Sequence, residues 1–159
     1  MIIVGFLDAA LAERFSFSFE KKPYSLSDVL EDDSAADPSL MASEAIRKKR
    51  AAAVAGKNVF YPSMWHENKA GNVSVLDYSC ALRTGASYNY LLVNGIRRPT
   101  SRELLRLQGF PESYKIVLPN ADVRRQTGNS VAVPMIRAVA RRMDALLKKG
   151  ALDAETEIA

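Results

Sequence analysis

The sequence predicts an α/β protein of 159 residues, in which a buried strand and several helices accompany a smaller region of short strands. Three observations carry this prediction. The chain begins with a continuous apolar run, residues 1–6, which is typical of a strand covered on both faces. Residues 57–96 are rich in Tyr, Asn, Ser, Val and Gly and contain alternating pieces, which indicate short twisted strands with polar turns. Helical signals occur at residues 39–55, at residues 100–109 and from Pro134 onward.

The N-terminal part of the chain is predicted to hold one strand, one short helix and one loop. The apolar run over residues 1–6 needs covered neighbours on each side, and nothing nearby in the sequence supplies them. Ser25–Leu30 has the serine or aspartate start of a short helix. The acidic stretch Glu31–Asp37 is closed by Pro38 and is typical of a loop.

The middle of the chain is predicted to pass from a helix into strands. The helix covers about residues 39–55, ends at Gly56 and carries the basic run Arg47–Arg50. Alternation of apolar and polar residues is clearest at Val73–Leu76. The single tryptophan, Trp65, is expected in the core of this strand region.

The C-terminal part is predicted to be helical. Thr100 is followed three residues later by Glu103, which is the spacing of a capping box and opens a helix that Gly109 ends. A last helix begins near Pro134, because proline suits the first turn of a helix. Residues 151–159 are expected to form a frayed tail.

Composition excludes several classes of protein. The hydrophobic share of 48% and the charged share of 25% are ordinary for a soluble globular protein. No stretch approaches the roughly 18 apolar residues of a membrane span. Asp8 interrupts the apolar start too early for a signal peptide, so a cytoplasmic protein is expected. The single Cys80 and the single His66 exclude an internal disulfide framework and a metal centre built from thiolates or histidines.

Charge is distributed unevenly along the chain. Residues 1–40 hold 3 basic and 8 acidic side chains, whereas residues 41–150 hold 19 basic and 7 acidic ones. The basic block is clustered and rich in arginine, which favours a phosphate-rich partner over a merely solvated surface. Charge therefore points to nucleic acid as a partner.

Two segments have the residue types of a functional site. Residues 97–111 read Arg-Arg-Pro-Thr-Ser-Arg-Glu-Leu-Leu-Arg-Leu-Gln-Gly-Phe-Pro, and residues 126–134 read Gln-Thr-Gly-Asn-Ser-Val-Ala-Val-Pro. Within the second, Gly128-Asn129-Ser130 is a small polar turn ahead of a helix. Glycine permits close backbone approach, and helix-start amides suit a carboxylate or another polar ligand. On physical grounds alone, a simple loop with a helix cap explains this turn better.

In this order and at this spacing, the two segments resemble the ninth and tenth motifs of the DNA (cytosine-5)-methyltransferases. The start of the chain, residues 2–6, is similar to the strand that closes the eighth motif of that family. The resemblance runs from residue 1 to about residue 145, with a more variable middle. It implies transfer of a methyl group from S-adenosylmethionine to C5 of cytosine in double-stranded DNA, in the setting of restriction-modification.

The resemblance also implies roles for both motifs. The family uses the turn of the tenth motif to line the S-adenosylmethionine pocket. The residues expected to bind the cofactor are therefore Gly128, Asn129, Ser130 and Val131. In the ninth motif, a hydrogen-bonded brace is expected between the recognition lobe and the catalytic lobe. Its residues are Thr100, Arg102 and Glu103.

Residues 80–95 lie where the family keeps its target-recognition region. Arginine and asparagine side chains there can read guanine or adenine edges with two hydrogen bonds, and the arginines that follow are placed to meet phosphates. Tyr88 and Tyr90 either contact the DNA or pack the lobe. The residues expected to bind DNA are Arg83, Tyr88, Asn89, Asn94, Arg97 and Arg98.

The parts that carry catalysis in this family are missing from the sequence. The family's nucleophile is a cysteine in a Pro-Cys-Gln motif, assisted by a glutamate in Glu-Asn-Val, and neither motif occurs here. Cys80 stands between Ser79 and Ala81 inside the recognition region and is a poor candidate. The eight glycines contain no Gly-x-Gly pair, so the first cofactor-binding loop is absent and the cofactor pocket is expected to be incomplete. The isolated chain is therefore expected to be inactive.

The resemblance implies the C-terminal fragment of a Rossmann-like methyltransferase with a small mixed α+β target-recognition lobe. Residues 1–38 are expected to supply a last strand and a connecting segment of the catalytic domain, residues 39–126 the recognition lobe with the ninth motif, and residues 127–150 the tenth motif and the return helix. Such a chain is a subunit that pairs with a second chain carrying the catalytic cysteine, a truncated remnant, or a DNA-binding module without catalysis. An RNA-methylating relative fits less well, because the recognition segment is more similar to bacterial restriction-modification enzymes.

Overall fold

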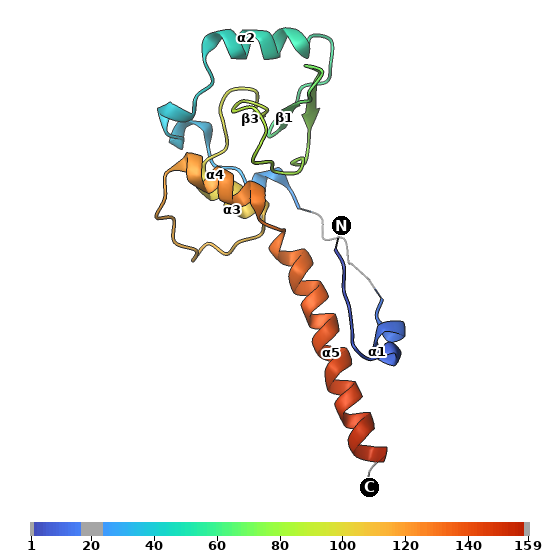
Figure 1. Cartoon of the computed structure of the whole chain (residues 1–159). Helices are drawn as coiled ribbons and strands as arrows, with labels where there is room; N and C mark the ends of the chain where they lie inside the picture. The colour runs from blue at the N-terminus through green and yellow to red at the C-terminus, as the bar shows by residue number, and fades with distance from the viewer. Residues whose placement is uncertain (1, 17–23, 158–159) are drawn as a thin grey trace. The chain divides into compact units, whose positions relative to one another are not determined.

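The computed structural model describes residues 2–16 and 24–157, and the chain divides into two compact units (Figure 1). Unit 1 comprises residues 1–22 and 132–159, and unit 2 comprises residues 23–131. All residues that the sequence assigned to a site belong to unit 2. Within the described ranges, no helix has the length and apolar character needed to cross a membrane.

Unit 1 contains two helices that contact each other, α1 (Ala9–Arg14) and α5 (Val133–Glu157). α1 was not predicted from the sequence, and it begins where the Asp8 carboxylate accepts a hydrogen bond from the Ala10 amide at 2.8 Å. α5 begins beside Pro134 as predicted. It continues to Glu157, so most of the segment predicted as a frayed tail is helical.

The apolar start of the chain is not a strand. Residues 2–6 have no regular secondary structure, and their side chains alternate between half-buried and exposed, with Ile3 82% exposed. Met1 lies outside the described residues. A strand covered on both faces needs neighbouring strands, and the sheet in the described part of the chain does not extend to this segment. The prediction of a buried strand at residues 2–6 is therefore wrong for this structure.

The sheet of unit 2 has three antiparallel strands in the order β2-β1-β3. They are β1 (Met64–Glu67), β2 (Val73–Leu76) and β3 (Leu91–Val93), so the prediction of short strands within residues 57–96 is confirmed. β1 is central, and Trp65 on it pairs in register with Leu92 of β3.

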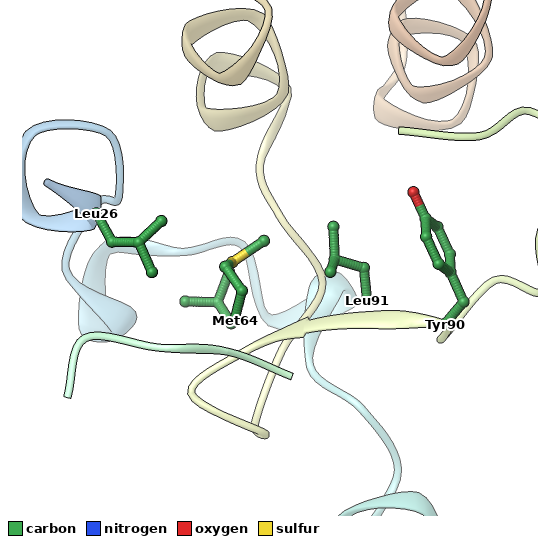
Figure 2. Packing of buried hydrophobic residues seen from close by; sticks show 5 residues of the cluster. Leu26, Met64, Tyr90 and Leu91 are labelled. Atoms are coloured by element: carbon green, nitrogen blue, oxygen red, sulfur yellow. The ribbon is translucent and has the colours of Figure 1, made fainter. Parts of the chain in front are cut away.

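Alternation along the strands produces two hydrophobic clusters, because successive side chains point to opposite faces of a sheet. On one face, Met64 and Leu91 pack with Leu26, which comes from the segment before the sheet (Figure 2). On the other face, Trp65 and Leu92 pack with residues at the two ends of α2. Trp65 is 6% exposed, which confirms its predicted place in the core.

The helices of unit 2 follow the predicted pattern with two differences. α2 (Glu44–Ala53) begins after Ser43, later than predicted, because residues 38–40 form a turn of their own. α3 (Ser101–Leu107) begins with the predicted capping box. α4 (Asn120–Asn129) was not predicted. Three single 3-10 turns lie in the N-terminal part of the unit: Leu26–Asp28, Asp33–Ala35 and Pro38–Leu40.

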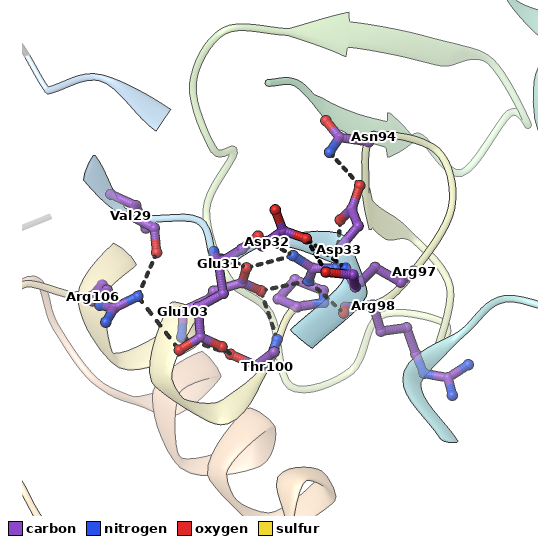
Figure 3. A network of polar contacts seen from close by, with 12 residues as sticks. Val29, Glu31, Asp32, Asp33, Asn94, Arg97, Arg98, Thr100, Glu103 and Arg106 are labelled. Atoms are coloured by element: carbon purple, nitrogen blue, oxygen red, sulfur yellow. Dashed lines mark hydrogen bonds and ion pairs between the residues drawn. The ribbon is translucent and has the colours of Figure 1, made fainter. Parts of the chain in front are cut away.

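A buried ion-pair network around Arg97 joins the acidic segment to β3 and α3 (Figure 3). The guanidinium of Arg97 donates to the two carboxylate oxygens of Glu103 at 2.7 and 2.8 Å, and both side chains are fully buried. It also donates to Asp33 Oδ1 at 2.6 Å, to the carbonyl of Glu31 at 2.9 Å and to the carbonyl of Arg98 at 3.4 Å. All five donors of the guanidinium are therefore engaged.

Glu103 is the second centre of the network. Its carboxylate accepts hydrogen bonds from the amides of Glu31 and Thr100, both at 2.7 Å, and the Thr100 hydroxyl donates to the Glu31 carboxylate at 2.8 Å. Burial opposes the charge on Arg97, but the hydrogen bonds and charges of Glu103 and Asp33 outweigh this effect and raise its pKa. The acidic stretch predicted as a loop is thus fixed to α3.

Candidate nucleic-acid interface and cofactor turn

Arginines and tyrosines gather on one surface of unit 2. The guanidinium carbon of Arg98 lies 4.3 Å from the centre of the Tyr88 ring, and that of Arg124 lies 5.3 Å from the same ring. Arg83 and Arg124 lie 5.2 and 5.8 Å from the Tyr90 ring. Tyr88 is 45% exposed, whereas Tyr90 is buried. These five residues are called the arginine–tyrosine cluster.

The arginine–tyrosine cluster holds the positive charges of Arg83, Arg98 and Arg124. Among the described residues, no Asp or Glu forms an ion pair with Arg83, Arg98 or Arg124. Arg98 and Arg124 donate instead to backbone carbonyls. These hydrogen bonds orient the guanidinium groups but do not neutralise their positive charge, because a carbonyl group is uncharged. The cluster encloses only about 10 Å³, room for about one water. It is therefore a charged surface rather than a pocket for a small ligand.

The predicted DNA-binding residues fall into two groups. Arg83 and Tyr88 are exposed, and Asn89 is half-buried beside Arg98, to which its Oδ1 is hydrogen-bonded at 3.2 Å. Asn94 is used elsewhere, because its Nδ2 donates to Asp33 at 2.8 Å and its Oδ1 accepts from the backbone at 2.9 Å.

Arg97 differs most from its predicted role. Arg97 is fully buried and all donors of its guanidinium are engaged, so no phosphate can reach it in this structure. The expectation that Arg97 binds DNA is therefore wrong for this structure, and so is the same expectation for Asn94, whose side chain is bonded within the protein. Burial alternates along residues 93–99, and Arg98 extends away from the network (Figure 3). Because burial alternates with a period of two residues, the adjacent Arg97 and Arg98 have different environments. Arg97 is buried in the network, and Arg98 lies at the surface. Sequence reasoning missed Arg124 because α4 was not predicted.

Two of the three residues predicted for the brace belong to the network around Arg97. Thr100 and Glu103 lie in it as described above, whereas Arg102 does not. The Nη2 of Arg102 donates to the carbonyl of Tyr114 at 3.0 Å, and its Nε lies 3.9 Å from a carboxylate oxygen of Glu112. Arg102 therefore binds the loop that follows α3. The place in the network that was expected for Arg102 is taken by Arg97.

The predicted cofactor turn forms the carboxyl end of α4, and it precedes α5, which begins at Val133. Gly128 and Asn129 are the last residues of α4, and Ser130 is its C-cap. The hydroxyl of Ser130 donates to the carbonyl of Thr127 at 3.0 Å and so ends the helix. The expectation that helix-start amides of this turn face a ligand is therefore wrong, because its backbone lies at the opposite end of a helix.

Gly128 packs directly on the backbone of residues 83–84. A Cβ atom on Gly128 would lie 2.7 Å from the Thr84 amide nitrogen and 2.9 Å from the carbonyl carbon of Arg83. The Thr84 hydroxyl is hydrogen-bonded to Asn129 Oδ1 at 2.7 Å. Gly128 does allow another group to come close, as predicted. That group is the backbone of residues 83–84 of the same unit.

A pocket of about 130 Å³ lies beside the end of α4. It is lined by residues of the loop 110–118 and of α4, with Thr127 and Ser130 among them. Pockets that enclose a small ligand usually measure roughly 300–1,000 Å³. This pocket is therefore too small to enclose a nucleoside-sized cofactor.

Cys80 has the properties of a packing residue. It is half-buried against the core cluster of Met64 and Leu91. Burial raises the pKa of the Cys80 thiol, although the charge of Arg83 acts in the opposite direction. A thiol that is protonated at neutral pH is a weak nucleophile.

Comparisons with known proteins agree on one family. The sequence profile of C-5 cytosine-specific DNA methylases matches residues 9–145. Type II methyltransferase M.HaeII of Haemophilus aegyptius is 50% identical over 144 residues, which are 89% of this chain and 43% of that protein. Type II methyltransferase M.NgoBI of Neisseria gonorrhoeae is 53% identical over 122 residues, which are 77% of this chain and 38% of that protein. The chain thus spans less than half the length of these relatives.

Gly128→Ala tests the packing between α4 and residues 83–84. Alanine normally stabilises a helix relative to glycine, by up to about 1 kcal/mol. Here we expect a loss of about 1–3 kcal/mol in the free energy of unfolding, measured by urea titration, because the new methyl group overlaps backbone atoms. Gly85→Ala is the matched control, since a Cβ there meets nothing within 4 Å. A stabilising effect of Gly128→Ala would contradict the close approach.

Proposed function

The chain belongs to the C-5 cytosine-specific DNA methylase family, and from this premise we propose that it is the target-recognition part of a DNA (cytosine-5)-methyltransferase. Such an enzyme transfers a methyl group from S-adenosylmethionine to C5 of cytosine in double-stranded DNA. The observation that carries the proposal is the arginine–tyrosine cluster, in which Arg98 and Arg124 flank the exposed Tyr88 while Arg83 and Arg124 lie over the buried Tyr90. None of these three arginines forms an ion pair with a carboxylate of the described residues.

The three arginines divide into two roles under this proposal. The guanidinium groups of Arg98 and Arg124 are already bound to backbone carbonyls, so they are held in place to meet phosphates. No acceptor binds the guanidinium of Arg83 among the described residues, and the side chain is exposed above the Tyr90 ring. Its free pair of donors suits the two acceptors on the major-groove edge of guanine. Asn89, beside Arg98, lies on the same surface.

The end of α4 is proposed to form one wall of the cofactor pocket. Asn129 is exposed, and its Nδ2 has no acceptor within the described ranges, so it can donate to the cofactor. Val131 is 55% exposed and offers an apolar surface beside it. Bound S-adenosylmethionine would supply the methyl group. Because the pocket of this chain is small, the other wall, together with the Pro-Cys-Gln and Glu-Asn-Val motifs, would come from outside the present sequence, in a further segment or a second chain.

The network around Arg97 is proposed to be the brace between the two lobes of the enzyme. In this assignment, residues 1–38 and 127–150 belong to the catalytic lobe and residues 39–126 to the recognition lobe. The bonds from Arg97 and Glu103 to residues 31–33 then cross from one lobe to the other. A binding module without catalysis is the second candidate, which the lack of both catalytic motifs in the sequence favours.

DNA binding should be weak and steeply dependent on salt, because the arginines mostly meet phosphates. Arg98→Ala and Arg124→Ala should each lower the affinity for duplexes of any sequence. Each should also reduce the slope of log affinity against log salt by about 1, as measured by fluorescence anisotropy. Lys48→Ala on α2 is the control, since it removes the same charge from an exposed side chain outside the cluster. Affinity that responds neither to salt nor to these substitutions would make the cluster an ordinary solvated surface.

Methyl transfer distinguishes the enzyme part from the binding module. The chain alone should transfer no tritiated methyl groups from S-adenosylmethionine to mixed-sequence DNA. Addition of the part of M.HaeII that this chain does not match should produce transfer that Cys80→Ala leaves unchanged. Binding of DNA without any transfer in the mixture would favour the module. Transfer by the chain alone that Cys80→Ala abolishes would overturn the proposed role.

A further inference from the structure

The end of α4 and the recognition segment meet in a contact that is both steric and hydrogen-bonded. The missing side chain of Gly128 lets the helix lie against the backbone of residues 83–84. The Thr84 hydroxyl lies 2.7 Å from Asn129 Oδ1 and 3.3 Å from the Arg125 carbonyl. A hydroxyl has a single proton, so the shorter contact, to Asn129, receives it. This bond fixes the amide of Asn129 and leaves its Nδ2 for a ligand.

The end of α4 is also held from its other side. Gln108, the C-cap of α3, donates to the carbonyl of Thr127 at 2.7 Å, and the Thr127 hydroxyl donates to the carbonyl of Val123 at 2.8 Å. Thr127 is buried. With the backbone held in this way, the orientation of the exposed Asn129 side chain depends on Thr84, its one side-chain hydrogen-bond partner among the described residues.

Thr84 follows directly on the arginine that is proposed to meet the bases. The Arg83 amide donates to the hydroxyl of Tyr90 at 3.1 Å, and its guanidinium lies over the same ring. Arg124 connects the same ring to α4. A displacement of Arg83 by DNA therefore moves the residue whose hydroxyl holds Asn129.

We propose that Thr84 is a positioning residue that couples the recognition segment to the cofactor turn through its hydrogen bond with Asn129. The inference rests on the proposed function, since it requires DNA at the arginine–tyrosine cluster and the cofactor at Asn129. In it, DNA engagement of Arg83 changes the setting of the Asn129 amide, and the hydroxyl of Thr84 carries that change.

NMR of the isotope-labelled full chain tests the coupling. A mixed-sequence DNA duplex at low salt is the probe, and the side-chain amide signals of Asn129 are the readout. We expect the duplex to shift these signals in the unaltered chain. Thr84→Val keeps the branched shape and removes the hydroxyl, so it should bind the duplex within about twofold of the unaltered affinity while the shift is lost. Thr84→Ser should restore the shift, and Ser87→Ala, which removes an exposed hydroxyl from the same segment, should not affect it.

Each outcome decides the inference. If Thr84→Val binds the duplex and the Asn129 amide signals still shift, the coupling is overturned. The coupling is also overturned if the unaltered chain binds DNA and the Asn129 amide signals do not shift. Failure of the unaltered chain to bind the duplex would overturn the proposed function and the inference with it. If Thr84→Val does not fold, Asn129→Ala removes the acceptor at an exposed position, and the DNA-induced shift of the Ser130 amide should then be lost. A shift that persists there would also overturn the coupling.

Discussion

The guanidinium of Arg97 carries its charge where water does not reach it, and Glu103, Asp33 and two backbone carbonyls supply the hydrogen bonds that water would otherwise supply. A buried charge that loses a partner typically costs about 3–5 kcal/mol. The fold of unit 2 must therefore bring the acidic segment, the residues after β3 and the first turn of α3 together. The position of α3 beside the acidic segment follows from this requirement.

The same constraint places the surface that is proposed to meet DNA. Arg98 is the neighbour of Arg97 on an extended stretch, so burial of one arginine turns the other outward beside Tyr88. The chain thus uses identical side chains for different purposes: Arg97 is buried and closes the fold, whereas Arg98 is half-buried beside Tyr88. The middle of α4 adds Arg124 to this surface, and its carboxyl end carries Asn129. Residues 83–84 and the end of α4, which are proposed to serve recognition and the cofactor, are therefore packed parts of one unit.

Sequence reasoning succeeded where local chemistry decides the structure. The capping box of Thr100 and Glu103 depends on residues three apart, and the short strands depend on alternation, so both were predictable. It failed where partners far apart in the chain decide. Arg97 resembles a phosphate ligand until Asp33 and Glu103 are seen around it, and α4 ends in Thr127-Gly128-Asn129, which are weak helix formers. The apolar residues 2–6 lack the neighbouring strands that a buried strand needs.

The division of labour between Arg97 and Arg98 is the central claim, and a pair of charge-preserving variants tests it most directly. Arg97→Lys and Arg98→Lys each keep the positive charge and lose the planar fork of donors. The free energy of unfolding and the affinity for a mixed-sequence duplex would be measured for both, with DNA binding under conditions in which both are folded. Arg97→Lys should lose about 3 kcal/mol of stability and bind DNA within about twofold of the unaltered chain, whereas Arg98→Lys should stay within about 1 kcal/mol in stability. A folded Arg97→Lys chain of unchanged stability and weakened DNA binding would contradict the account.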